Sequence, residues 1–218
     1  MISLINILAL VLAYLLGSIA SAVWIGQIFY GTDVREYGSG NSGATNAFRV
    51  LGKKAGIAVL LIDSTKGWLS VNLITLLHTL GITHLLPGTG PFIDFQLALG
   101  IAALLGHIFP VYVGFRGGKG IATLLGIILA VHTGAALASM GVFIVVLLIT
   151  RYVSLSSMVA ATAFPVVVIL VFETTISSLV IFSLVIAILV LITHQKNIER
   201  LLRKEESKAN LFGKSDQQ

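Results

Sequence analysis

Three short polar segments of this chain carry the residue types that bind phosphate. The first, residues 38–49, holds glycines at the spacing G-x-G-x-x-G, several hydroxyl and amide side chains, and one arginine. Glycine lets backbone N–H groups converge on an anion, and a guanidinium group forms paired hydrogen bonds with phosphate. The segment therefore predicts an anion site, built from Gly38, Gly40, Gly43, Ser39, Asn41, Ser42, Thr45, Asn46 and Arg49.

Two other interpretations apply to this first segment. A dinucleotide-binding fold is rejected, because its glycine motif must follow a strand inside a βαβ unit, whereas this one follows a long apolar run. A flexible loop with a basic membrane anchor remains open for Arg49 by itself. It does not account for the amides and hydroxyls that accompany the arginine.

The second segment groups glycines around one lysine, just before a predicted helix, at Gly117, Gly118, Lys119 and Gly120. It fails the pattern of a nucleotide phosphate loop, because the lysine is followed by glycine rather than serine or threonine. It still predicts an anion site, since a helix N-terminus presents unpaired N–H groups. His107 lies upstream, and both a structural role inside the bundle and a direct catalytic role remain open for it.

The third group lies near the C-terminus and in a short segment before it. His194 and Asn197 are three residues apart, so a helix would place them on one face. Ser154 and Ser157 are hydroxyl donors that either bind phosphate or cap a helix. The basic residues that follow, with interspersed leucines, predict a tail that lies amphipathically on the inner leaflet.

Composition identifies the class of protein that carries these segments. Hydrophobic residues make up 56% of the 218 and charged residues 11%, against about 25% charged in soluble domains. The chain is therefore predicted to be an all-α integral membrane protein. Without cysteine it has no thiolate metal ligands, and its carboxylates and histidines lack ligand spacing, so we expect no metal and no cofactor. The net charge of +5 suits loops facing anionic lipid rather than nucleic acid.

Seven membrane spans are predicted, with the N-terminus outside and the C-terminus in the cytoplasm. Basic residues cluster in 31–56, 114–120, 151–157 and the tail, whereas 78–94, 131–134 and 173–175 have no lysine or arginine. Basic loops stay on the cytoplasmic side, so the run 121–149 must cross twice, as two short helices turning at 132–134. The spans are 2–29, 57–77, 95–113, the two within 121–149, 158–172 and 176–193.

The whole chain, 1–218, is predicted to form one polytopic membrane domain, with 199–218 as its basic cytoplasmic tail. Asp63 and Lys66 fall inside the second span. Ionisable groups within a membrane are rare and usually paired, so we interpret them as an ion pair that is structural or shapes the site.

The three segments together resemble the motifs of the bacterial acyl-phosphate:glycerol-3-phosphate acyltransferases, the PlsY family. The pattern G-S-G-N-x-G-A-T-N-x-x-R-x-x-G is matched by residues 38–52, and G-H-x-x-P followed by G-G-K-G-x-A-T by 106–110 and 117–123. The pattern H-R-x-N-I-x-R-L-L-x-G-x-E is matched by 194–206, where Gln195 and Lys204 depart from it. These two departures affect peripheral contacts of the tail, and the resemblance covers nearly the whole chain.

The resemblance implies transfer of a fatty acyl group from acyl phosphate to the sn-1 hydroxyl of glycerol 3-phosphate, which yields lysophosphatidic acid and inorganic phosphate. This is the first acylation of phospholipid synthesis, in the bacterial cytoplasmic (inner) membrane with the site facing the cytoplasm. Membrane lipid surrounds the protein, and a soluble enzyme that produces acyl phosphate is a candidate partner.

The residues then take hypothetical roles. Catalytic positions are Ser39, Arg49, Lys119, His194 and Asn197; phosphate-binding positions are Asn41, Thr45, Gly117, Gly118, Gly120, Ser154 and Ser157; supporting positions are His107 and Glu206. The rival class is a small transporter for a phosphorylated solute. It is disfavoured because transporter sites lie near the midplane of the bilayer, whereas these polar groups gather on one face. A membrane scaffold would not need them.

Overall fold

The computed structural model describes residues 4–209, and every regular element in that range is helical. This confirms the predicted all-α class. The helices are α1 Leu4–Gly17, α2 Ser21–Tyr30, η1 Val34–Glu36, α3 Ala44–Val50, α4 Lys53–Thr79, α5 Gly90–Ile108, η2 Val111–Val113, α6 Ile121–Val131, α7 Thr133–Thr150, α8 Val153–Val166, η3 Val167–Val171, α9 Ser177–Thr193 and α10 Gln195–Leu202.

The chain forms two compact units, which are described separately. The first contains α1 to α6, and the second contains α7, α8, most of α9, and α10. A single polytopic domain stays a prediction. The end of the predicted tail, 210–218, lies outside the described residues.

Four helical stretches are long and apolar enough to cross a membrane: Lys53–Thr79, Gly90–Val113, Thr133–Thr150 and Val153–Val171. Two bent pairs, α1 with α2 at 43° and α9 with α10 at 59°, raise the number of candidates to six in the part of the chain that the structure describes. α6 is apolar but has 11 residues, about 16 Å of helix, against a hydrocarbon core of about 30 Å. The count of seven and the orientation therefore stay predictions.

The predicted first span is not one continuous helix. The chain leaves helical geometry after Gly17 and resumes it at Ser21. At this point α1 and α5 touch backbone to backbone: a Cβ at Gly17 would overlap the Ala103 carbonyl, and one at Gly106 would overlap the Tyr14 carbonyl. Close approach through small residues is a common way to pack membrane helices.

The predicted interruption at 132–134 is confirmed as a break between helices. α6 ends at Val131, His132 has non-helical angles (φ −150°, ψ 81°), and α7 begins at Thr133. The Thr133 hydroxyl donates to the Leu129 carbonyl at 2.9 Å, so a side-chain hydrogen bond connects the two helices across the break. Whether each helix crosses the membrane stays a prediction.

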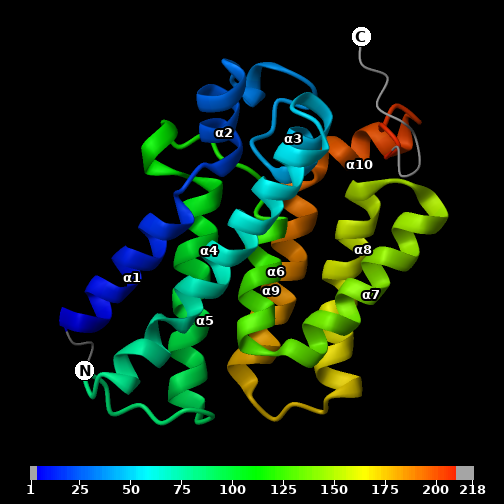
Figure 1. Cartoon of the computed structure of the whole chain (residues 1–218). Coiled ribbons are helices and arrows are strands. Elements are labelled where there is room, and N and C mark those ends of the chain that lie inside the picture. Colours follow the sequence, from blue (N-terminus) through cyan, green and yellow to red (C-terminus); the bar gives the residue numbers. More distant parts are fainter. Residues whose placement is uncertain (1–3, 210–218) are drawn as a thin grey trace. The chain divides into compact units, whose positions relative to one another are not determined.

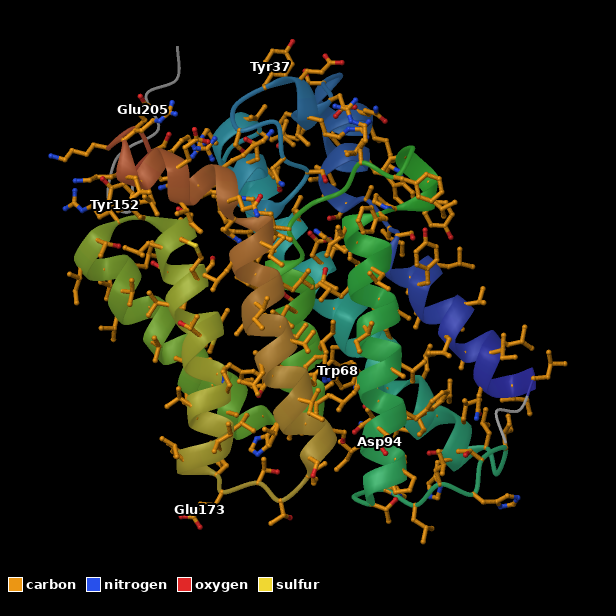
Figure 2. All side chains as sticks on the ribbon, turned by 180° about the vertical axis from the view of Figure 1, so that it is seen from behind. Tyr37, Trp68, Asp94, Tyr152, Glu173 and Glu205 are labelled. Carbon is orange, nitrogen blue, oxygen red and sulfur yellow. The ribbon has the colours of Figure 1, made fainter. Side chains whose placement is uncertain are left out.

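Within the first unit, the loops that carry the first two polar segments gather at one end of α4, α5 and α6 (Figure 1). Figure 2 places Tyr37 at that end and Asp94 at the other. α4 and α6 pack so closely that a Cβ at Gly67 or Gly126 would overlap a backbone carbonyl of the facing helix. Both glycine-rich loops thus lie at the same end of the unit, next to the closely packed helices α4 and α6.

Candidate functional site

The first polar segment is a loop shaped by one buried amide. The Oδ1 of Asn46 accepts from the Ser39 N–H at 2.9 Å, and its Nδ2 donates to the Val34 carbonyl at 2.7 Å and the Tyr37 carbonyl at 3.1 Å. Gly38 has φ +63°, and a Cβ there would overlap Oδ1 of Asn46. Asn46, which the sequence grouped with the substrate donors, instead holds the loop in shape.

Among the other predicted donors of this loop, three face outward and Ser42 is buried. Ser39, Thr45 and Arg49 are exposed, and Cδ of Arg49 lies 3.4 Å from the position of a Cβ at Gly38. The guanidinium stem therefore lies along the glycine loop. Asn41 is half-buried and its Oδ1 accepts from the Gly43 N–H at 3.0 Å, which leaves its amide nitrogen as the donor for a ligand.

The second segment lies against the end of α5. The N–H of Gly117 donates to the Ile108 carbonyl at 3.1 Å, and the N–H of Gly118 donates to the His107 carbonyl at 3.2 Å. A Cβ at either glycine would overlap His107. Glycine is thus required sterically at both positions, and Gly120, with φ +78°, starts α6.

Lys119 is half-buried between two buried glycines at the start of α6. His107 itself is buried, and its Nδ1 lies 3.1 Å from the Thr123 hydroxyl on the first turn of that helix. The imidazole therefore supports the turn that carries the lysine. The remaining ring nitrogen, Nε2, is directed at Gly118.

An arginine and a carboxylate that the sequence analysis did not assign join these two loops. Arg35 makes paired bonds to Asp33, from Nε at 3.0 Å and Nη2 at 2.6 Å, and its Nη1 donates to the Val113 carbonyl at 2.9 Å. The hydrogen bonds from Arg35 lower the pKa of the Asp33 carboxyl, and Asp33 in turn raises the pKa of Arg35. Both groups therefore stay charged at neutral pH.

The third group comes together in the second unit around one carboxylate. Oε1 of Glu206 accepts from the Ser154 hydroxyl at 2.6 Å and from Nδ2 of Asn197 at 2.7 Å, and Oε2 accepts from Nε of Arg200 at 2.8 Å. Burial raises the pKa of Glu206, but the three hydrogen bonds together outweigh it and leave the pKa below its ordinary value. Glu206 thus gathers Ser154 and Asn197 by hydrogen bonds, and its supporting role stays a prediction.

Ser157 and His194 are engaged with their own helices. The Ser157 hydroxyl donates to the Val153 carbonyl at 2.9 Å, a contact inside α8. His194 is buried at the bend between α9 and α10, and its Nδ1 is 2.8 Å from the Val190 carbonyl. A carbonyl can only accept, so Nδ1 carries the hydrogen and Nε2 of the neutral ring has the lone pair.

Replacing Glu206 with glutamine tests this cluster. A glutamine amide cannot accept all three hydrogen bonds as a carboxylate does, so we expect Glu206→Gln to lose about 1–2 kcal/mol of stability at pH 7. Because the folded-state pKa is lowered, the carboxylate stabilises the protein above the ordinary value of 4.5. That contribution is lost as the pH falls through the folded-state pKa.

The measurement is the thermal midpoint in detergent at pH 7 and at pH 4. The difference between the unsubstituted protein and Glu206→Gln should be large at pH 7 and shrink at pH 4. Glu205→Gln serves as the matched control, because Glu205 is exposed and adjacent. A difference that is independent of pH would contradict the assignment.

The residues that could hold a metal ion do not come together. Among residues 4–209, no group of three histidine, aspartate or glutamate side chains lies at coordinating distance.

Comparison with known proteins identifies the family. Residues 7–204 match the family model described as glycerol-3-phosphate acyltransferase. The chain belongs to this family. It is 42% identical to glycerol-3-phosphate acyltransferase 2 of Bacillus anthracis over 203 residues, which are 93% of this chain and 98% of that one. It is 37% identical to the Chlorobium phaeobacteroides (strain BS1) acyltransferase over 238 residues, covering 99% and 100%.

Two solved structures of the family have the same fold. The glycerol 3-phosphate form of PlsY (YgiH), an integral membrane acyltransferase, matches with a TM-score of 0.82 and 35% identity, covering 95% of this chain and 99% of that one. The lysophosphatidic acid form matches with a TM-score of 0.77 and 34% identity, covering 93% and 94%. The predicted PlsY resemblance and the integral membrane class are confirmed.

The predicted site residues thus fall into two sets. Within the first unit Arg35, just before the first glycine loop, bonds to Val113 just before the second, and His107 contacts the second loop. Within the second unit Glu206 brings Ser154 and Asn197 together. Asp33 and Arg35 were missed because an Asp-x-Arg pair reads as two unrelated loop charges. Their i, i+2 spacing, next to Gly31, was the available signal.

Proposed function

We propose that this protein transfers a fatty acyl group from acyl phosphate to the sn-1 hydroxyl of glycerol 3-phosphate. The products would be lysophosphatidic acid and inorganic phosphate. Support comes from family membership and from the relatives solved in glycerol 3-phosphate and lysophosphatidic acid forms. The choice of acyl phosphate as the donor rests on the two glycine loops at one end of the first unit. Two substrates that each carry a phosphate need two anion pockets.

The proposed reaction needs no covalent intermediate. The hydroxyl oxygen of glycerol 3-phosphate attacks the acyl carbon, and the bond from that carbon to the phosphate oxygen breaks. The hydroxyl proton passes to the departing phosphate or to Nε2 of His194. The acyl phosphate is already activated, so the protein supplies position and charge stabilisation.

The residues divide the work as follows. Lys119 with the backbone of Gly117, Gly118 and Gly120 would hold the acyl-phosphate headgroup and the leaving phosphate. Ser39, Asn41, Thr45 and Arg49 would bind phosphate from the first loop. Ser154 or Ser157 would complete the donor pocket, and His194 with Asn197 would orient glycerol 3-phosphate. Both hydroxyls already donate within the second unit, Ser154 to Glu206 and Ser157 to the Val153 carbonyl, so either serine would exchange that bond for one to phosphate.

The site would face the cytoplasm in a bacterial inner membrane. The loops assigned to it contain lysine and arginine, whereas residues 78–94 and 173–175 contain neither, and basic loops stay on the cytoplasmic side. Such a site meets soluble glycerol 3-phosphate from the cytoplasm and an acyl chain from the inner leaflet. A soluble acyl-phosphate-producing enzyme could deliver the donor on the same side.

The test is phosphate release by the purified protein in detergent, given palmitoyl phosphate with or without glycerol 3-phosphate. We expect release that depends on glycerol 3-phosphate and an equal amount of lysophosphatidic acid. In detergent, vectorial transport of a phosphorylated solute cannot register. Folded protein that releases no phosphate, or releases it regardless of glycerol 3-phosphate, would exclude the proposed reaction.

A further inference from the structure

Four polar side chains form a buried cluster in the first unit, beneath the second glycine loop. Ser21, Asp63, Lys66 and His107 come from α2, α4 and α5, and each is less than one-tenth exposed. Ser21, Asp63 and Lys66 have no role in the proposed binding of either substrate, and His107 supports the turn that carries Lys119. Buried ionisable groups at membrane depth are costly, so their presence calls for a function.

The cluster begins at the break between α1 and α2. Interrupting a helix inside a membrane frees backbone carbonyls that must find new donors. Here Nζ of Lys66 donates to the Ile19 carbonyl at 2.6 Å. The lysine is 3% exposed, and its ammonium group is the donor for a backbone carbonyl at the helix break.

Asp63 balances that cation and connects it to α2. Its Oδ1 lies 2.7 Å from Nζ of Lys66, one turn along the same helix, and accepts from the Ser21 hydroxyl at 2.7 Å. Oδ2 of Asp63 is buried and has no hydrogen-bond partner in the described part of the chain. One carboxylate oxygen therefore anchors both α4 and the first residue of α2.

The same oxygen of Asp63 also lies near His107, which packs against Gly118 in the second glycine loop. Oδ1 of Asp63 is 3.8 Å from Nδ1 of His107, the nitrogen that also contacts Thr123 on α6. The other edge of the ring fills the space against Gly118, where a Cβ would overlap Nε2. The imidazole therefore lies directly against Gly118, whose N–H also donates to the His107 backbone carbonyl.

We propose that Asp63 and Lys66 are positioning residues for donor binding, which act through His107 on the turn formed by residues 117–120. The ion pair fixes the imidazole, the imidazole supports Gly118, and the turn then presents Lys119 and its N–H groups to the phosphate of the acyl donor. This inference rests on the proposed function for the identity of the ligand. The physical link between the ion pair and the turn does not depend on it.

Three variants separate positioning from simple stabilisation: Asp63→Asn, Lys66→Met, and the two combined. Each single variant leaves one buried charge without its partner and should lower the thermal midpoint. The combined variant leaves no unpaired charge, so its midpoint should recover in part, although the Ile19 carbonyl still loses its donor. Asp94→Asn is the matched control, since Asp94 is exposed on α5, at the opposite end of the unit (Figure 2).

The kinetic readout is KM for palmitoyl phosphate compared with KM for glycerol 3-phosphate. In Asp63→Asn and in the combined variant we expect the donor KM to rise roughly tenfold, less than the ~10²-fold effect of misplacing a group by about 1 Å. The KM for glycerol 3-phosphate should stay within about twofold, on the scale of a few tenths of a kcal/mol. A combined variant that regains both stability and donor KM would show that the pair is structural and overturn the proposal.

Hydrogen exchange of the 117–120 amides gives a readout that does not require activity. We expect faster exchange there in Asp63→Asn and in the combined variant, and no change in Asp94→Asn. Unchanged exchange at these amides would overturn the inference even if the enzyme is active. Faster exchange in a protein that makes no lysophosphatidic acid from palmitoyl phosphate would retain the link between ion pair and turn and reject the proposed reaction.

Discussion

Arg49→Ala should lower kcat/KM for the acyl transfer about 10²-fold, because a hydrogen bond from a charged group to phosphate is worth up to about 3 kcal/mol. Arg49 is exposed, its stem lies along Gly38, and the neighbouring Asn46 fixes the backbone of that loop. The substitution removes an exposed charge and leaves the buried loop bonds in place. We therefore expect the loss in activity without a comparable loss in stability.

The measurement is steady-state formation of lysophosphatidic acid by Arg49→Ala and Arg49→Lys, with the thermal midpoint of each protein. Lysine keeps the charge but not the planar fork, so it should recover part of the rate. Arg203→Ala is the matched control: that side chain is 64% exposed and pairs with Glu199 on its own helix. Near-normal turnover by folded Arg49→Ala protein would remove Arg49 from the site.

Several features could be predicted because they depend on local chemistry. Long apolar runs define helices in a membrane, and the polar interruption at 132–134 ends α6 as expected. The grouping of glycines with Arg49 and with Lys119 was also visible, since motif residues lie close together in sequence. Each of these inferences used residues within a few positions of one another.

Features that depend on distant contacts could not be predicted. The break after Gly17 lies where the α1 backbone meets the Ala103 carbonyl of α5, a contact between positions far apart in the chain. Asn46 looks like a ligand donor in sequence, yet its three partners are backbone groups of the preceding loop. An amide suits both roles, and only the fold decides between them.

The two buried networks explain why a membrane protein tolerates so many polar residues near its site. In the first unit one Asp63 oxygen satisfies Lys66 and Ser21, and in the second one Glu206 carboxylate satisfies Ser154, Asn197 and Arg200. In both cases a carboxylate gathers donors from separate helices. Hydrogen bonds from these donors lower the cost of burying each carboxylate, although Oδ2 of Asp63 has no hydrogen-bond partner among the described residues.

Gly118→Ala should be the most informative single change in the second glycine loop. The backbone of Gly118 is not in the left-handed region, so alanine could adopt its conformation, but the new Cβ would overlap Nε2 of His107. The ring cannot easily yield, because it is buried and contacts Thr123. The loop must move instead, and a displacement near 1 Å would cost roughly 10²-fold in kcat/KM for palmitoyl phosphate.

Gly141→Ala is the matched control for this prediction. Gly141 lies inside α7, and a Cβ there would meet no atom within 4 Å, so alanine should leave activity unchanged and add up to about 1 kcal/mol of helix stability. Removing the ring in Gly118→Ala/His107→Ala makes room for the new methyl group. If the overlap is the cause, that double variant should bind palmitoyl phosphate better than Gly118→Ala, and full activity of Gly118→Ala would show that the turn does not set the donor site.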